Sequence, residues 1–342
     1  MEYTEVKNAH IVPRSYLKNF AVEEKIMLIA DGKALGGPIS IDNAAIRKRF
    51  YRRFRPNGEP IYDIEWSLSQ LENVVAPMLG TVATNWPLPS EEKHALAEYF
   101  AYQFVRGPRW KAWREEMARE EIAKHRRNPE PVLHKGIWIA QTQKQINQEE
   151  DRLLSESEWL TRMMVIANRL ITAFGSMRWH LIEFDEPLLA ISDHPVVAWP
   201  LAADYRRPEP TPAGLGVLNF LEVRAPISSS LLLLMLWQDL PDASEILAGS
   251  EDIAANANAF TIANAERQWM HLPGGKVPIA EGYLDPISVG LVPSFGRPEV
   301  EASRIRHTAG HLLEQKIGQD IHDAVDENGR MQAQIVPPPE PA

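Results

Sequence analysis

Apolar residues recur every three or four positions in the first half of the chain, the period of a helix with one buried face. Ser90 and the two glutamates after it are typical of a helix start, because serine caps the first turn and acidic side chains favour it. Gly107 and Pro108 mark the end of the same helix. Helices are therefore predicted at residues 63–79, 90–106, 110–127 and 156–173.

The second half contains short apolar segments separated by proline, aspartate and serine, the pattern of antiparallel strands joined by tight connections. Helices and strands are thus segregated along the chain. We therefore predict an α+β fold with a helical N-terminal half, a mostly antiparallel sheet in the second half and closing C-terminal helices. Strands are predicted at residues 26–31, 39–41, 177–184, 188–199, 219–227 and 229–237, and further helices at 250–271 and 301–324.

No stretch of linker composition divides the chain, so we predict a single domain over residues 1–330 and an extended or disordered proline-rich tail at 331–342. The hydrophobic content of 44% fits a folded protein. The most apolar run, residues 231–237, is far shorter than the ~20 residues of a membrane-spanning helix. With no cysteine and no secretory signal, a cytoplasmic protein with no membrane partner is expected.

The net charge of −10 opposes binding to nucleic acid except at a local basic patch. Residues 47–55 form such a patch, with six cationic side chains among aromatic ones. This segment can hold a phosphate backbone while its aromatic side chains stack on bases. The alternative is a loop or edge strand whose aromatic side chains point inward and whose charges face acidic helices of the same protein. The pattern favours this second interpretation.

The common catalytic motifs are missing. The sequence has no GxxxxGK[ST] phosphate loop, no GxGxxG dinucleotide loop, no HExxH zinc motif and no GxSxG nucleophile elbow. No signature of a nicotinamide, flavin or haem site is present, and the lack of cysteine excludes thiolate metal sites and cysteine nucleophiles. The segment from His10 to Pro13 is similar to the entry of His-Asn-His nucleases, but the ββα pattern of those enzymes does not surround it.

Several short elements, in order along the chain, together resemble a microbial family catalogued as domain of unknown function 4238. The resemblance covers roughly residues 8–270. The resemblance implies which positions are important and in what order they occur, but the family has no established reaction to carry over. The elements are Asn8-x-His10-x-Val12-Pro13-x-x-Tyr16-Leu17-x-x-Phe20, Phe50-Tyr51 ahead of Glu65 and Glu72, Gln103-x-x-Arg106-x-Pro108, Ser192-Asp193-His194-Pro195-Val196, Pro226-Ile227-Ser228 and Asn258.

Several of these positions carry side chains with chemistry of their own. Asp193 lies between an apolar strand and a proline, where a carboxylate projects into a cleft or caps a tight turn. His10 can act as a base, a metal ligand or a phosphate contact, or it can pin the N-terminal segment to the body. Gln103 and Arg106 share a helix face, and Arg106 can clamp an anion or bind Glu72 or Asp193 internally.

Glu65 and Glu72 are two helical turns apart and hence on one face, where the ordinary alternative is a solvated surface. His194 follows Asp193 directly, so the two side chains serve one site only if the backbone turns between them.

Three classes of function remain open. The first is a hydrolase, a phosphoesterase or nuclease, in which Asp193, His10 and Glu72 supply acid–base groups or ligate a divalent metal. The second is a sensor that binds a small anion or nucleotide without reaction. The third is a structural or interaction protein of a defence or toxin–antitoxin system, whose polar residues are only buried networks. In the first two classes the ligand would be held by Gln103, Arg106, Ser192, His194 and Asn258.

Overall fold

A strand of consecutive leucines lies at the centre of the main sheet. All six residues of β14 (Leu231–Leu236) are buried, because β13 and β10 pair with its two edges and helices cover both faces. The strand order is β12-β13-β14-β10-β15, antiparallel except where β15 runs parallel to β10. This confirms the predicted α+β fold with a mostly antiparallel sheet. The remaining strands are β10 (Arg178–Glu183), β12 (Val197–Pro200), β13 (Phe220–Ser228) and β15 (Leu247–Ala248).

The computed structural model describes residues 8–34, 36–55, 57–129, 131–134, 137–200, 214, 216, 219–237, 243–282 and 284–287. All of these belong to one compact unit, residues 1–293, and a second unit comprises residues 294–342. The helix predicted at 301–324 and the tail at 331–342 lie outside the described residues. The single domain to residue 330 therefore stays a prediction.

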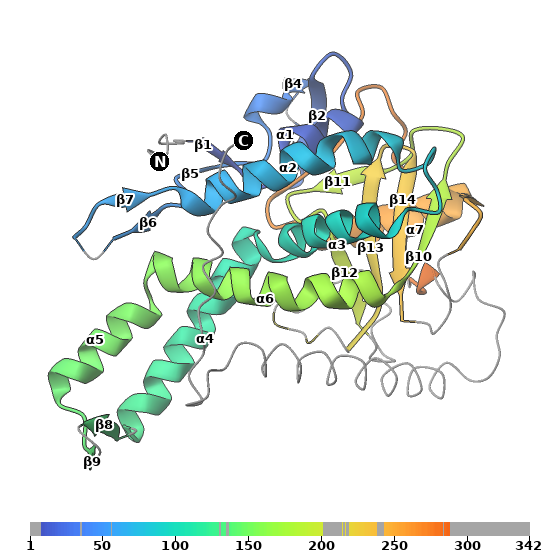
Figure 1. The fold of residues 1–342 in the computed structure, drawn as a ribbon. Helices are drawn as coiled ribbons and strands as arrows, with labels where there is room; N and C mark the ends of the chain where they lie inside the picture. Colours follow the sequence, from blue (N-terminus) through green and yellow to red (C-terminus); the bar gives the residue numbers. More distant parts are fainter. Residues whose placement is uncertain are drawn as a thin grey trace, which may run out of the picture. The chain divides into compact units, whose positions relative to one another are not determined.

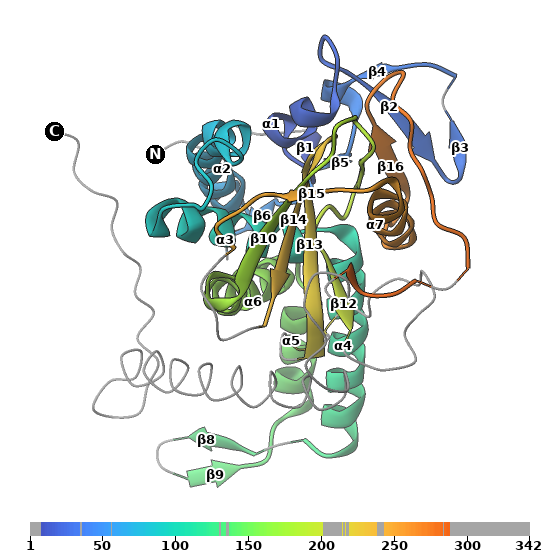
Figure 2. The same cartoon turned by 90° about the vertical axis from the view of Figure 1, so that its right-hand side faces the viewer.

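Helices cover the two faces of the main sheet (Figure 2). On one face, α3 and α6 lie side by side, and Phe100 of α3 meets Trp179 of β10 with ring centroids 6.3 Å apart. On the other face, Phe260 of α7 packs on Trp199 of β12, with ring centroids 4.9 Å apart. The predicted helices of the first half are confirmed. The long helices are α2 (Asp63–Thr81), α3 (Ser90–Val105), α4 (Pro108–Arg127), α5 (Gln143–Leu153), α6 (Glu156–Ser176) and α7 (Glu251–Ala263).

A second sheet corrects one prediction. The helix expected over residues 250–271 ends at Ala263, and residues 268–271 form strand β16 instead. This strand pairs on one side with β11 and on the other with β2, so long-range pairing overrides the local helical preference of the alanine-rich segment. The sheet comprises β11 (Ala190–Ser192), β16 (Gln268–His271), β2 (Lys25–Ala30), β3 (Lys33–Ala34) and β4 (Ile39–Ser40), with β4 paired back on β2 as predicted.

The N-terminal segment is fastened to the main sheet by hydrogen bonds. The Tyr16 hydroxyl donates to the Pro226 carbonyl at 2.8 Å, and the Asn19 side chain donates to the Ile227 carbonyl at 3.1 Å. Residues far apart in sequence are thereby joined. The small elements here are β1 (Asn8–His10), α1 (Arg14–Leu17), the 3₁₀ helices η1 (Lys18–Phe20) and η2 (Ile41–Asn43), β5 (Ile46–Lys48), β6 (Arg53–Phe54) and β7 (Pro60–Ile61).

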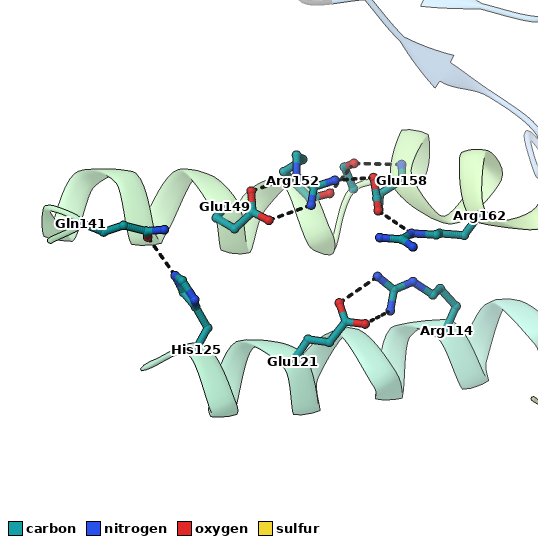
Figure 3. Close-up of polar contacts among 9 residues, drawn as sticks. Arg114, Glu121, His125, Gln141, Glu149, Arg152, Glu158 and Arg162 are labelled. Carbon is teal, nitrogen blue, oxygen red and sulfur yellow. Dashed lines mark hydrogen bonds and ion pairs between the residues drawn. The ribbon is translucent and has the colours of Figure 1, made fainter. Parts of the chain in front are cut away.

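Helices α4 and α5 form an arm that extends away from the main sheet and ends in the hairpin β8 (Val132–His134) and β9 (Ile137–Ile139) (Figure 1). Its apolar contact is small, comprising Ala118, Ile122 and Leu153. Ion pairs add to it: Arg126 of α4 joins Glu150 of α5 at 2.5 Å. Glu158, at the start of α6, joins Arg152 of α5 at 2.6 Å and so ties the arm to α6 (Figure 3). Among the described helices, none is long and apolar enough to cross a membrane.

Tyr16→Phe tests the link between the N-terminal segment and the main sheet. The variant removes one buried hydrogen bond and keeps the ring, so we expect the free energy of unfolding to fall by about 1 kcal/mol. Urea denaturation measures this loss. Tyr62→Phe is the matched control, because Tyr62 is buried but its hydroxyl bonds to no described residue. Equal midpoints for wild type and Tyr16→Phe would show that the bond contributes nothing.

Candidate functional site

The C-terminal end of α3 places an arginine inside the protein. The helix ends at Val105, and its C-cap Arg106 is followed by Gly107 and then by Pro108, the first residue of α4. Proline at this position begins a new helix readily, because its missing N–H needs no partner there. The chain therefore turns a sharp corner, and the Arg106 side chain is only 3% exposed.

Every nitrogen of the Arg106 guanidinium donates a hydrogen bond to a different element. Nε donates to the Tyr51 hydroxyl at 3.0 Å, Nη1 to Glu72 of α2 at 2.7 Å, and Nη2 to the His10 carbonyl at 2.5 Å. Burial alone would lower the pKa of Arg106, but Tyr51 and Glu72 outweigh it, and the net shift is upward. The structure thus brings together three of the predicted site residues, His10, Glu72 and Arg106.

Glu65 lies on the same helix as Glu72 and is half-buried. Burial raises its pKa to about 7, the negative charge of Glu72 adds to the rise, and Arg106 opposes it. A carboxyl group that titrates near neutral pH is suited to donate or accept protons. Glu65 is therefore a stronger acid–base candidate than the sequence indicates.

His10, whose carbonyl binds Arg106, also carries a half-buried imidazole. Its Nε2 atom is buried and has no hydrogen-bond partner among the described residues. Burial lowers the pKa of His10, which favours the neutral ring. The ring therefore keeps one nitrogen available.

Further polar atoms around the end of α3 lack hydrogen-bond partners among the described residues: Tyr99 Oη, both amide atoms of Gln103, and Nδ1 of His194. Because a helix rotates by 100° per residue, Gln103 lies on the same side of α3 as Arg106 and Gly107. A Cβ added at Gly107 would lie 3.4 Å from His194 Nδ1, so His194 borders this side of α3. Burial lowers the pKa of His194 to about 3, so its ring is neutral. Buried atoms without partners cost about 1–3 kcal/mol each, so water or a ligand is expected at them.

The predicted catalytic Asp193 is held by backbone groups. Its Oδ1 accepts from the Glu266 N–H at 2.8 Å, and its Oδ2 accepts from the Arg267 and Gln268 N–H groups at 3.0 and 3.3 Å. Burial raises the pKa of Asp193, and these donors oppose the rise. Both oxygens thus fix the turn between α7 and β16.

Two other predicted ligand residues are also engaged with backbone. The Ser192 hydroxyl donates to the His194 carbonyl at 2.8 Å and accepts from the His194 N–H at 3.1 Å, which turns the chain after Asp193. The Asn258 side chain accepts from the Ala190 N–H and donates to the Leu188 and Pro278 carbonyls, each at 2.8 Å. Neither side chain reaches Arg106.

A second buried arginine lies on the opposite face of the main sheet. Arg224 and Glu222, both in β13 and both fully buried, form an ion pair of 2.5 Å. The guanidinium lies 5.0 Å from the ring centroid of Trp199 and 4.9 Å from that of Phe260. This pair is not among the predicted site residues, although two opposite charges two residues apart in a predicted strand necessarily share one face.

The described part of the chain contains no group of side chains that could ligate the divalent metal considered above. No three histidine, aspartate or glutamate side chains gather there closely enough to hold an ion. The described site instead has one cation, Arg106, with Glu72 and Glu65 as its acidic neighbours.

Fold and site together define an α+β protein with a buried polar junction at the end of a central helix. The chain belongs to the family described as "Protein of unknown function (DUF4238)", whose profile matches residues 8–274. Every residue of the junction lies within this span. No curated protein and no solved structure matches the chain.

Arg106→Ala tests how far the junction depends on its guanidinium. Removing one partner of a buried ion pair costs about 3–5 kcal/mol, because the groups left behind are uncompensated. We expect a loss of this size in the free energy of unfolding, measured by urea denaturation. Arg55→Ala breaks an exposed pair with Glu59 and should cost less than about 1 kcal/mol. Equal losses in the two variants would contradict the prediction.

Glu65→Gln tests the raised pKa. The folded protein binds the Glu65 proton more tightly than the unfolded chain, with a pKa of about 7 against an ordinary 4.5. The contribution of Glu65 to stability is therefore fully present below pH 4.5 and is lost as the pH rises through 7. Relative to Glu65→Gln, wild type should lose stability between about pH 5 and about pH 8. Denaturant titrations at several pH values check this, with the exposed Glu120→Gln as control. A pH-independent difference between wild type and Glu65→Gln would refute the shift.

Proposed function

We propose that this protein is a hydrolase for an anionic substrate, with its acid–base centre at the junction of α2, α3 and β1. The observation that carries the proposal is the set of groups around Arg106. A carboxyl group with a pKa of about 7 and a second carboxylate lie beside one buried guanidinium, which also binds the carbonyl of His10, a residue whose imidazole has an unpartnered nitrogen. General acid–base catalysis is most effective when the pKa of the catalytic group is close to the working pH.

Each group has a role that its surroundings support. Neutral His10 accepts a proton at Nε2 from the attacking water, and protonated Glu65 gives its proton to the leaving oxygen. The water oxygen forms the new bond as the bond to the leaving group breaks, and the two protons balance when His10 and Glu65 return to their starting states. Arg106 supplies positive charge near the developing anion, and Glu72 holds the guanidinium in place.

The remaining predicted residues divide between substrate contact and support. Gln103 and Tyr99 have unused hydrogen-bonding capacity that suits a polar substrate, and His194 borders the same side of α3. Asp193, first assigned as a catalytic carboxylate, is replaced in this proposal by Glu65, because both of its oxygens serve the turn at 266–268. Ser192 and Asn258 support the backbone in the same way.

A sensor that binds a small anion is the second candidate. It is favoured by the unpartnered atoms of Tyr99, Gln103 and His194, which would bind a ligand whether or not a reaction follows.

Hydrolysis of chromogenic phosphate monoesters, phosphate diesters and carboxylic esters tests the proposal. We expect wild type to cleave at least one of these classes. Glu65→Gln and His10→Ala should be about 10²–10⁴-fold slower, while Glu120→Gln keeps full activity. The wild-type rate should fall as the pH rises through about 7, because Glu65 then loses its proton, and Glu65→Gln should lack this limb.

Thermal unfolding of each variant verifies that it is folded. If folded wild type cleaves none of the three classes, the hydrolase proposal fails. Thermal shifts with nucleotides and inorganic phosphate then test the sensor, which requires a shift in wild type that Gln103→Ala abolishes.

A further inference from the structure

The basic segment at residues 47–55 divides into neutralised and uncompensated cations. Arg53 forms an ion pair with Asp63, and Arg55 forms one with Glu59. These two contacts match the interpretation that the charges of the segment serve the protein itself. So does the burial of Phe50 and Tyr51, whose rings point inward.

We call Lys48, Arg52 and Phe54 of the same segment the basic strip. Lys48 is exposed and Arg52 is partly exposed, and neither forms an ion pair with a described residue. The Arg52 guanidinium lies 4.8 Å from the ring centroid of Phe54, which is 44% exposed. The strip thus combines an exposed aromatic ring, a cation beside it and a second cation on β5, in a chain with a net charge of −10.

The basic strip borders the polar junction. Strand β5 pairs with β1 so that Lys48 is opposite Asn8 and Ile46 is opposite His10. Lys48 and His10 therefore share one face of the ladder as diagonal neighbours, about 7–8 Å apart. Tyr51, directly before Arg52, reaches inward to Arg106. One short segment thus carries both the strip and a wall of the junction.

We propose that the basic strip binds single-stranded nucleic acid and that the substrate of the junction is its phosphodiester backbone, an inference that rests on the proposed hydrolase function. Lys48 and Arg52 contact phosphates, and Phe54 stacks on an unpaired base. The strip fits a single strand rather than a duplex, because bases in a duplex are already stacked on each other. It also fits nucleic acid better than an acidic peptide, because carboxylates give Phe54 no stacking partner.

The test is fluorescence anisotropy of full-length protein with a labelled oligodeoxythymidylate of about 12 nucleotides at low salt. With two phosphates neutralised, log K should fall with log salt concentration with a slope of about −1.4. We expect the double variant Lys48→Glu/Arg52→Glu to bind at least about tenfold more weakly, and Phe54→Ala to lose about fivefold or more. The duplex of equal length should bind more weakly than the single strand.

Lys25→Glu/Lys33→Glu is the matched control. Both lysines are exposed in the β2–β3 hairpin, and the exchange alters the net charge by the same amount as the strip variant. If this control weakens binding as much as the strip variant, the effect is one of net charge and the inference is wrong. It is also wrong if Phe54→Ala binds like wild type, or if polyglutamate competes as well as the oligonucleotide at equal charge.

The two proposals fail separately. If wild type cleaves a small chromogenic diester but does not bind the oligonucleotide, the basic strip is refuted and the hydrolase stands. If wild type binds the oligonucleotide as expected but cleaves neither it nor any small ester, the strip is a nucleic-acid site and the hydrolase proposal is refuted.

Discussion

A buried guanidinium must find its counter-charge and its hydrogen-bond acceptors inside the protein, and this requirement organises the N-terminal half of the fold. Arg106 cannot be satisfied by α3 alone. It needs the His10 carbonyl from β1, the Tyr51 hydroxyl from the following turn and the Glu72 carboxylate from α2. These elements are short or far apart in sequence, and their shared partner explains why they meet at one helix end.

The two buried arginines show why burial alone does not mark a functional site. Arg224 is fully enclosed by Trp199 and Phe260, and its carboxylate partner Glu222 also accepts a backbone N–H. Even so, the Arg224 Nη2 atom is buried without a hydrogen-bond partner among the described residues, and burial lowers the pKa of Arg224. Around Arg106, by contrast, neighbouring atoms keep unused hydrogen-bonding capacity, and a carboxyl group titrates near neutral pH. The difference lies in the groups that surround each guanidinium and not in the guanidinium itself.

Local patterns predicted most of the fold, because the spacing of apolar residues and the capping of helices depend on residues close together in the sequence. The leucine run of β14 and the end of α3 before Pro108 are examples. The site was predictable only in part. The sequence shows that Arg106 and Glu72 can pair, but the same sequence permits Asp193 as the partner. Which one is chosen, and the use of Asp193 at the α7–β16 turn, depends on pairing across the chain. Strand β16 also depends on long-range pairing, and for this reason local preference did not predict it.

The corner between α3 and α4 has a consequence for how such a chain changes length during evolution. Only Arg106 and Gly107 separate the two helices, so a residue inserted there would change the position of Arg106 relative to the arm. Extra residues in the β8–β9 hairpin, at the far end of the arm, would leave the corner unchanged (Figure 1). The arm is therefore free to grow or shrink from its outer end, while its base is fixed in length by the site beside it.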